Sequence, residues 1–578
     1  MSGTTTTNAT TTNATANEMA FGMYKEYNVS IYVLLFMLLV LTSIGVSHVL
    51  EQRLQLHFIS SSGAIIIVGL IAGALCSFDQ SDIVARWLVG FDPNVFFVGL
   101  LPPIIFNSGK DEFMSMFITC GHIGYTMKRR HFFDNLTSIL MFAILGTFIS
   151  AVVVGGFLYL LGTIGLSLQM PLAECLAFGA LISSTDPVTT LAVFQELHVD
   201  PKLFYIVFGE SVLNDAISIV LFNTFVKFIG VTEVHAHAVS YAVLDFIGVC
   251  VGSILVGVTF GCLSSIALKH VKGLAVMHEV SLFVLVAYIP FLVAEVLELS
   301  GIVAILFAGM FMRHYTFNNL SSAAKDIASN LFHIVAFMCE LVVFLNLGLS
   351  FFAMERGLSI PFMLWSLLAC LVARAMHVYP LSSLRNVCMR RGDTQNRLDR
   401  NEQHMIWFSG LRGAIAFSLA LSFPAPFREE VRAATMVVVV VTVLVMGGLT
   451  VKALDVLNIQ RLVHKDDASD SADAVHSSIS RHVLLKWDAT YLMPWLTNAV
   501  PPTYDDVDVH SIPSSESTPN SVTDDGEDEQ RTLAANVRRD IAIEDAVTTE
   551  GDAVHPSHST HHHEVIAAPS ALDAVVLV

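Results

Sequence analysis

The sequence is poor in charged residues. Asp, Glu, Lys and Arg together make up 14% of the 578 residues, whereas hydrophobic residues make up 54%. A soluble globular protein carries about a quarter charged residues. The apolar residues stand in long blocks, and several blocks exceed the ~20 residues that a helix needs to cross a bilayer. The composition therefore excludes an ordinary soluble protein and indicates an all-α polytopic membrane protein.

Basic residues are scarcer than acidic ones, and the net charge is −19. From Arg461 to Val578 the chain holds 21 acidic and 7 basic residues, so this tail alone accounts for −14 of that charge. The acidity is therefore a property of the tail. We expect no nucleic-acid partner.

Paired cysteines are missing as well. The eight cysteines form no CxxC motif, and most lie inside apolar segments, which favours small core residues over disulfides or a metal site. No Arg-rich transit peptide or cleavable signal is evident, so the first hydrophobic stretch is interpreted as a retained span. The tail histidines, His555, His558 and His561–His563, are interpreted as solvated residues rather than metal ligands.

Two stretches lack the apolar residues of a folded core. Residues 1–29 are polar and Thr/Asn-rich, and residues 457–578 are largely rich in Ser, Pro, Asp and Glu. We predict that both are largely disordered. Within the tail, Arg481–Trp495 is weakly amphipathic and suited to a membrane surface. Residues 30–456 between them are predicted to form the membrane domain.

The membrane domain contains thirteen apolar blocks that we interpret as spans. They lie near residues 30–49, 60–77, 92–109, 136–162, 171–195, 203–228, 242–268, 276–297, 299–313, 325–351, 360–380, 405–423 and 432–453. With a cytosolic C-terminus, the predicted inner loops carry fifteen Lys and Arg residues and the outer loops four, in agreement with the positive-inside rule. Asn8, Asn13 and Asn28 then begin Asn-x-Ser/Thr motifs on the lumenal or extracellular side, where glycosylation is possible.

The most informative polar residues lie in the sixth span, in Phe208-Gly-Glu-Ser-Val-Leu-Asn-Asp-Ala216. An ionisable residue near the middle of a span is costly and marks a functional site by default. Helical spacing places Ser211 with Asp215 on one face, and Glu210 with Asn214 on the adjacent face. The Asp215 carboxylate and the Ser211 hydroxyl are hard oxygen ligands for Na⁺ or K⁺, and the carboxylate can take a proton instead. The alternative is a buried carboxylate that only pairs with an arginine.

The fifth span contains Ser183-Ser-Thr-Asp-Pro-Val188. Proline inside a helix removes a hydrogen bond, whereas Asp followed by Pro suits the N-cap and first position of a new half-helix. We therefore expect this span to be broken near its middle, which a membrane tolerates only where the backbone lines a cavity. The freed Thr185 carbonyl could ligate a cation. Asp186 could coordinate the cation directly, or cap the half-helix and tune the site through its charge.

The twelfth span contains Ser409-Gly-Leu-Arg-Gly-Ala-Ile415. Two glycines and an arginine in an apolar segment predict a second interrupted helix, and a role of the glycines in close helix packing is compatible with it. Two interrupted spans in different halves of the chain indicate a transporter built from inverted repeats. Arg412 would place a fixed positive charge near the carboxylates.

Glu340 in the tenth predicted span and Arg374 in the eleventh form a fourth place of interest, and Glu210 in the sixth also needs a partner. A buried acid without a partner is neutralised or strongly destabilising. Arg374 is the best candidate partner for Glu210, because its guanidinium offers planar, bidentate donors. We expect this role to be mostly structural.

These residues resemble the eukaryotic sodium/proton exchangers of the cation/proton antiporter superfamily, from about residue 30 to residue 455. The resemblance is carried by Leu100-Leu-Pro-Pro-Ile-Ile-Phe-Asn-Ser-Gly109, Lys128-Arg-Arg-His-Phe-Phe133, Ser183–Pro187, His198-Val-Asp-Pro201, Gly209–Ala216, Ser300-Gly-Ile-Val-Ala-Ile-Leu306, His314-Tyr-Thr316 and Trp407–Ala416. The amino-acid sequence around Gly209–Val220 and Trp407–Ile415 is most similar to that of the endomembrane branch, whose members are in the Golgi and endosomes.

The resemblance implies a homodimer of thirteen-span subunits, each with a dimerisation domain and a six-helix core domain in which the fifth and twelfth spans are broken and cross. It implies that Asp215 binds the cation and the proton, and that Asn214 before it accompanies electroneutral exchange. The other matching positions are Thr185, Asp186 and Ser211 at the ion site, with Glu210, Arg374 and Arg412 as supporting charges.

One residue departs from the pattern. Many relatives have an acidic residue at the position of Asn107, and in related antiporters that acid interacts with the groups around the Asn-Asp pair. With Asn107 in place of that acid, we expect Arg412 to interact with a different partner. The ion selectivity or the pH set point can then differ from those of the relatives. The tail is also short beside those of plasma-membrane members, so their regulatory binding sites are not carried over, although tail-binding regulators and membrane lipid remain possible partners.

The expected mechanism is alternating access around one competing site. Asp215 binds either a cation or a proton and is neutral in both forms, so each transit of the core domain carries one ion. The coupling needs no ATP and no cofactor, and we expect a transporter rather than an enzyme. The alternatives are a cation channel and an intramembrane aspartyl protease using Asp186 and Asp215, although the Gly-x-Gly-Asp signature of such proteases is missing.

Overall fold

The membrane domain is helical throughout its described part. The structure is a computed structural model that describes residues 30–31, 33–50, 60–78, 95–107, 137–186, 188–197, 199–231, 236–271, 273–353, 359–388, 397–459 and 491–497. No strand occurs among these residues. The motifs Asn8, Asn13 and Asn28 and almost all of the acidic tail lie outside them.

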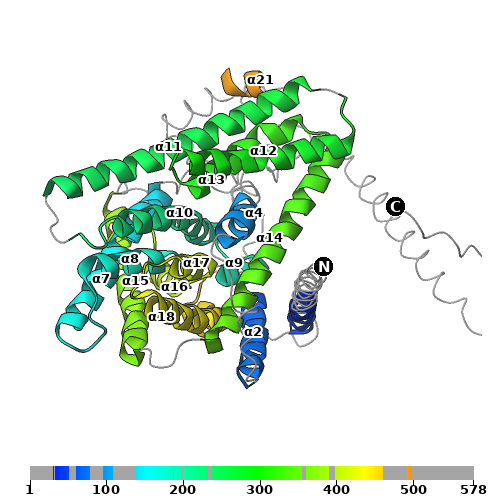
Figure 1. The fold of residues 1–578 in the computed structure, drawn as a ribbon. Coiled ribbons are helices and arrows are strands. Elements are labelled where there is room, and N and C mark those ends of the chain that lie inside the picture. Colours follow the sequence, from blue (N-terminus) through cyan, green and yellow to red (C-terminus); the bar gives the residue numbers. More distant parts are fainter. Residues whose placement is uncertain are drawn as a thin grey trace, which may run out of the picture. The chain divides into compact units, whose positions relative to one another are not determined.

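A helix within residues 30–50 opens the described chain. Most of the later α-helices are labelled in Figure 1. The later helices are α2 (Ser61–Phe78), η2 (Val95–Leu100), α4 (Leu101–Asn107), η4 (Met141–Gly146), α7 (Thr147–Thr163), α8 (Leu172–Ser183), α9 (Val188–Glu196), α10 (Pro201–Val226), α11 (Ala236–His270), α12 (Val276–Val296), α13 (Gly301–His314), η5 (Thr316–Asn319), α14 (Ser322–Ser350), η6 (Phe351–Ala353), α15 (Ile360–Cys388), α16 (Arg400–Phe408), α17 (Ala414–Leu421), α18 (Arg428–Val441), η7 (Thr442–Gly447), α19 (Thr450–Val456) and α21 (Met493–Leu496).

Seven of the described helices are long and apolar enough to cross a membrane, which confirms the polytopic fold. They are Thr137–Thr163, Lys202–Val226, Ser240–His270, Val276–Val296, Ser322–Ser350, Ile360–Cys388 and Arg428–Gly447. Five shorter apolar helices overlap five of the six other predicted spans, and the twelfth predicted span corresponds to α16 and α17. The count of thirteen stays a prediction, because α13 has 14 residues and is short for a full crossing.

Both predicted interruptions are present. The fifth span divides into α8, which ends at Ser183, and α9, which begins at Val188. The twelfth divides into α16, which ends at Phe408, and α17, which begins at Ala414. The local sequence rules that predicted these breaks therefore hold in the folded chain.

The helix that carries the Asn-Asp pair has a well-defined start. Asp200 is the N-cap of α10, its carboxylate accepts a hydrogen bond from the Lys202 backbone N–H at 2.8 Å, and Pro201 takes the first helical position. Proline is favoured there because that backbone N–H has no intrahelical partner. This start fixes the register in which Glu210, Asn214 and the neighbouring residues of α10 face their surroundings.

The helices form two packed groups. In one, α7, α8, α10, α15, α16, α17 and α18 contact one another; in the other, α11, α12 and α13 pack together, and they lie side by side in Figure 1. The long helix α14 contacts α2, α4, α12 and α17. In the most apolar part of α10, 72% of the residues are buried inside the molecule, against 17% for α11. The helix with the polar motif is therefore an interior helix.

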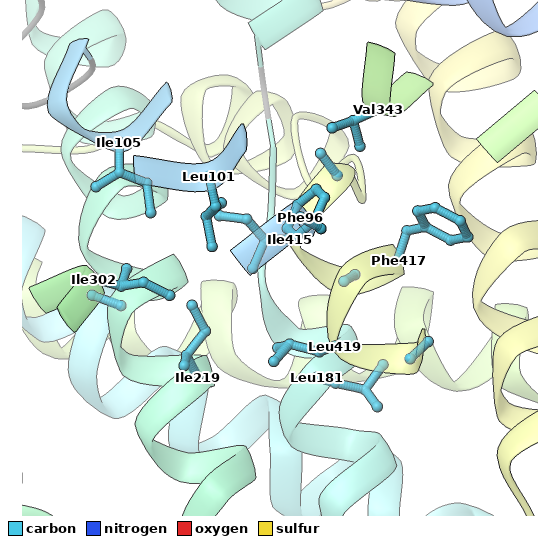
Figure 2. Close-up of a cluster of buried hydrophobic side chains, with 14 of the residues drawn as sticks. Phe96, Leu101, Ile105, Leu181, Ile219, Ile302, Val343, Ile415, Phe417 and Leu419 are labelled. Carbon is cyan, nitrogen blue, oxygen red and sulfur yellow. The ribbon is translucent and has the colours of Figure 1, made fainter. Parts of the chain in front are cut away.

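A continuous apolar core surrounds the broken helices. Figure 2 shows side chains of several helices that belong to this core, among them Leu181 of α8, Ile219 of α10, Ile302 of α13 and Phe417 of α17. These residues are almost completely buried. Burying such a side chain contributes about 1.5–3 kcal/mol, and the core therefore holds the half-helices in place around the polar residues.

The described part of the tail, α21, packs on the membrane domain. Met493 and Leu496 are buried against Tyr315. The Ser265 hydroxyl donates to the Leu496 carbonyl at 2.7 Å, and the Lys269 ammonium donates to the Pro494 carbonyl at 2.7 Å. These donors satisfy carbonyl groups that have no partner at a helix C-terminus. The amphipathic pattern of this stretch did not predict the docking.

The crossing of α2 and α14 generates a stability prediction. A Cβ at Gly348 would lie 2.6 Å from the Ile66 carbonyl oxygen and 2.8 Å from the Gly69 Cα. We expect Gly348→Ala to lower the unfolding temperature, because overpacking costs about 1–3 kcal/mol and the clashing atoms are backbone. Thermal unfolding of the purified chain in detergent measures this. Gly156→Ala in α7, where nothing lies within 4 Å of the added Cβ, is the matched control and is expected to be neutral or stabilising. Equal effects of the two substitutions would contradict the close crossing.

Candidate functional site

The two helix breaks meet each other. The Asp186 backbone N–H, in the first break, donates to the Leu411 carbonyl in the second at 2.9 Å. The Asp186 carboxylate packs so closely on Gly413 that a Cβ on residue 413 would overlap it. Backbone groups freed by an interruption need partners at this depth, and here each break supplies partners for the other. The second break thus requires a glycine at position 413.

Arg412 fills the junction of the breaks. Its side chain is 1% exposed. The guanidinium Nη1 donates to the Ser183 carbonyl at 2.9 Å and to the Ser184 carbonyl at 3.3 Å, at the end of α8, where carbonyl groups lack helical partners and the helix dipole is negative. Its backbone N–H donates to the Thr442 hydroxyl at 3.1 Å. A fixed positive charge therefore stands at the first break, where its guanidinium bonds backbone carbonyl oxygens and interacts with the Cys370 thiol.

The polar face of α10 closes the site from the other side. The Ser184 hydroxyl donates a short hydrogen bond to Asp215 Oδ1. Asn214 Nδ2 donates to the Thr185 hydroxyl at 2.5 Å, and the Ser211 hydroxyl donates to the Thr185 carbonyl at 2.9 Å. The structure therefore brings all of the predicted ion-site residues of α10 to the first break.

The result is a compact group of oxygen atoms. Asn214 is 1% exposed, and its Oδ1 atom has no hydrogen-bond partner among the described residues. The Asp215 carboxylate lies beside it in sequence and is the titratable group of α10 that faces the break. Carboxylate, amide and hydroxyl oxygens suit a hard monovalent cation. The described residues contain no group of three or more His, Cys, Asp or Glu side chains that could hold a metal ion.

A second buried cluster lies one helix face away. Arg374 of α15 makes a bidentate ion pair with Glu210, with Nη1 on Oε1 and Nη2 at 3.1 Å from Oε2. Arg374 Nη2 also donates to the Ile406 carbonyl of α16 at 2.8 Å. Both charged side chains are nearly inaccessible. The predicted pairing of Glu210 with Arg374 is confirmed, and it joins α10, α15 and α16.

Two predicted supporting residues stand apart from these contacts. Asn107 is the last residue of α4, and its buried Oδ1 has no hydrogen-bond partner among the described residues. Glu340 lies half-buried on α14. The roles of both remain predictions.

Sequence reasoning missed three polar residues of the site. Ser184 bonds Asp215, Thr442 of η7 bonds the Arg412 backbone, and His377 of α15 lies 3.1 Å from Arg374 Nη1. Two of the three could have been found from the sequence. Ser184 lies within the motif that predicted the break, and His377 follows Arg374 by about one helical turn and so lies on the same face of the helix. Nothing in the sequence indicated Thr442, whose contact arises from tertiary packing.

Known proteins show similarity along most of the chain. The family described as "Sodium/hydrogen exchanger, transmembrane" matches residues 36–455. The chain is 38% identical over 437 residues to Sodium/hydrogen exchanger 8 of Mus musculus, covering 74% of this chain and 72% of that protein. It is 36% identical over 448 residues to Sodium/hydrogen exchanger 5 of Arabidopsis thaliana, covering 76% and 81%.

A solved structure has the same fold. The sodium proton antiporter MjNhaP1 from Methanocaldococcus jannaschii, determined at pH 8, matches with a TM-score of 0.55 and 16% sequence identity. The match covers 76% of this chain and 100% of that chain. The helical arrangement described above is therefore shared with that protein.

The buried ion pair generates a second stability prediction. Arg374→Met leaves the Glu210 carboxylate buried without its charged partner, which costs about 3–5 kcal/mol. We expect a large fall in unfolding temperature in detergent, and partial recovery in the double variant Glu210→Gln/Arg374→Met, because no charge then stays unpaired. Lys227→Met removes the exposed pair with Asp245, at 2.6 Å, and serves as the control, since exposed pairs contribute about 0–1 kcal/mol. Equal stability of the Arg374 and Lys227 variants would contradict a structural role of the pair.

Proposed function

This chain belongs to the sodium/hydrogen exchanger family, and we propose that it is a secondary active antiporter that exchanges Na⁺ or K⁺ for H⁺ across a membrane. The observation that carries the proposal is the junction of two interrupted helices against Asp215 of a buried helix. Interrupted helices around a buried carboxylate are the arrangement by which many transporters hold a cation near the membrane midplane. The relatives' names support Na⁺ and H⁺ as the ions.

Asp215 is the proposed carrier of both ions. Its carboxylate binds a cation in the deprotonated form and releases it when a proton binds. The cation-loaded and protonated forms have the same local charge, so either can cross the low-dielectric middle of the protein, whereas the empty carboxylate is charged and crosses poorly. Because Asp215 crosses only when it carries a cation or a proton, the movements of the two ions are coupled without ATP or a cofactor.

Asn214 makes the exchange electroneutral in this proposal. It takes the position beside Asp215 where a second carboxylate would add another titrating charge, and its amide nitrogen is already held by the Thr185 hydroxyl. Its buried Oδ1 is directed to no described partner and is available as a neutral cation ligand. One titrating carboxylate then exchanges one cation for one proton.

The neighbouring residues complete the proposed site. Ser184, Ser211 and Thr185 supply hydroxyl or carbonyl oxygens close to Asp215. Arg412 occupies the end of α8 rather than pairing with a carboxylate in the described contacts, so its positive charge stabilises the interrupted backbone. Asp186 acts through its charge and its backbone contact with the second break.

The oligomeric state and the membrane of residence are inferred from the family resemblance. We infer a homodimer because the family resemblance implies one, and a Golgi or endosomal membrane because the motifs Gly209–Val220 and Trp407–Ile415 are most similar to the endomembrane branch. Membrane lipid is the expected neighbour of helices such as α11, whose apolar residues Leu244, Ile247 and Leu255 are exposed.

Replacing the carrier tests the mechanism directly. Asp215→Asn removes the exchangeable charge but keeps the shape, and we expect sodium-driven proton flux in proteoliposomes to fall to the level of protein-free liposomes. Asp245→Asn, at an exposed acid of α11, is the matched control and should exchange like the unmodified chain. Sustained flux through the Asp215 variant would reject this carboxylate as the carrier.

The response to voltage separates exchange from a channel. The free energy of a net charge that crosses the membrane changes by about 2.3 kcal/mol per 100 mV, which corresponds to a factor of about fifty in the equilibrium concentration ratio. We expect the exchange rate to be unchanged when the liposome potential is clamped at zero or at about 100 mV, because one cation is exchanged for one proton. A steep voltage dependence, or single-channel currents in a planar bilayer, would support the channel alternative.

A further inference from the structure

His377 is a buried titratable residue that the proposed mechanism does not use. It lies on α15, one helical turn after Arg374, and its side chain is as deeply buried as the ion pair beside it. The ring packs against Gly146 of η4, where an added Cβ would lie 3.1 Å from the histidine Cδ2. The ring is thus fixed between its own helix and η4.

The two ring nitrogens have different partners. Nδ1 lies 3.0 Å from the Ala373 carbonyl, which can only accept, so the Nδ1 atom carries the proton. Nε2 lies 3.1 Å from Arg374 Nη1, which can only donate, so Nε2 is the unprotonated acceptor. These two contacts define the neutral Nδ1–H tautomer of His377.

This tautomer completes the hydrogen bonding of the two terminal nitrogens of Arg374, whose buried Nε–H has no partner among the described residues. One terminal nitrogen, Nη1, donates to Glu210 and to His377; the other, Nη2, donates to Glu210 and to the Ile406 carbonyl. All four terminal N–H groups are therefore used. The histidine acceptor keeps the guanidinium plane turned toward the Glu210 carboxylate, and Glu210 is next to Ser211 in the site helix.

We propose that neutral His377 is a positioning residue for exchange, which accepts a hydrogen bond from Arg374 and so keeps this guanidinium on Glu210, and that protonation of His377 withdraws this support and lowers the maximal exchange rate. The inference rests on the proposed antiport. It concerns the helix that carries Asp215, not the competition between ions at Asp215 itself.

A second proton on His377 conflicts with the described geometry. The Nε2–H would point at the Arg374 Nη1–H groups, donor against donor, and would compete for Glu210 Oε1, which lies 3.7 Å from Nε2. Arg374 would then lose an acceptor, and the cluster would gain a positive charge. Because the hydrogen bonds of Arg374 join α10, α15 and α16, their weakening loosens the packing of these three helices, which the proposed alternating access needs to move together.

Among the described residues, Glu210 and Arg374 are the charged groups that interact with His377. From α10 it faces Glu210, from its own helix Arg374, and Arg412 in the second break interacts electrostatically with both of these. Of the other elements that contact α15, η4 and α7 have no charged residue. The first turns of α18 hold Arg428, Glu429, Glu430 and Arg432, and α16 holds Arg400, Glu402, which pairs with Lys202, and His404, which bonds the Tyr379 hydroxyl at 2.9 Å. The acid response is therefore assigned to His377 and its contacts with Glu210 and Arg374.

Saturating Na⁺ separates the two effects of acid. Competition at Asp215 raises the apparent KM for Na⁺ and is overcome by more Na⁺, whereas protonation of His377 lowers the maximal rate at any Na⁺ concentration. We propose to measure the rate of Na⁺-driven proton flux in proteoliposomes of the full chain between about pH 5 and pH 8, where histidine changes its charge, and to extract KM and the maximal rate at each pH.

Two substitutions distinguish titration from structure. His377→Gln places an amide oxygen near the position of Nε2 and cannot be protonated, so its maximal rate should no longer fall with acid, while its KM still rises because Asp215 is intact. His377→Leu removes the acceptor of a hydrogen bond from a charged group, and we expect a maximal rate about tenfold lower throughout, equivalent to about 1.4 kcal/mol. His404→Gln is the histidine control and should follow the unmodified chain.

The possible results are separable. A maximal rate of the unmodified chain that does not fall with acid, or an identical fall in His377→Gln, overturns the inference and leaves antiport standing. Unreduced exchange by a well-folded His377→Leu, monitored by gel filtration and thermal unfolding, overturns it as well. Absence of Na⁺-driven proton flux from the unmodified chain would instead overturn the proposed function.

Discussion

The mutual satisfaction of two broken helices is the constraint on which the rest of the membrane domain depends. An interruption inside a membrane exposes backbone groups that lipid cannot satisfy. Here the Asp186 N–H donates to the Leu411 carbonyl, and Arg412 donates to the carbonyl end of α8. Neither break would be stable without the other, so a junction of polar groups is obligatory at the point where the ions are proposed to bind.

Around this junction, charge is stabilised in two different ways. Glu210 and Arg374 neutralise each other and hold three helices together. Asp215 has a hydroxyl partner, Ser184, in place of a basic side chain in its described hydrogen bonds. A carboxylate held by an arginine would be kept permanently charged, whereas one held by a hydroxyl can accept an ion or a proton. Adjacent turns of α10 thus carry one acid with a structural role and one that is available for exchange.

Much of this arrangement could be predicted from the sequence, because its causes are local. Asp186 before a proline, and Arg412 between two glycines, predict the two interruptions from backbone chemistry alone. The spacing of Glu210, Ser211, Asn214 and Asp215 assigns them to faces of a helix. Ser184, Thr442 and the docking of α21 on α11 could not be found in this way, since they depend on which segments meet in space. The tautomer of His377 likewise follows only from its neighbours.

A single carboxylate beside a neutral asparagine also sets a thermodynamic limit. Under the proposed one-for-one exchange no net charge moves, so transport stops when the cation concentration ratio across the membrane equals the proton ratio. A tenfold sodium gradient, equivalent to about 1.4 kcal/mol, then sustains a difference of about one pH unit. The Asn214–Asp215 pair would in this way convert the salt gradient of a compartment into its acidity, independently of the membrane potential.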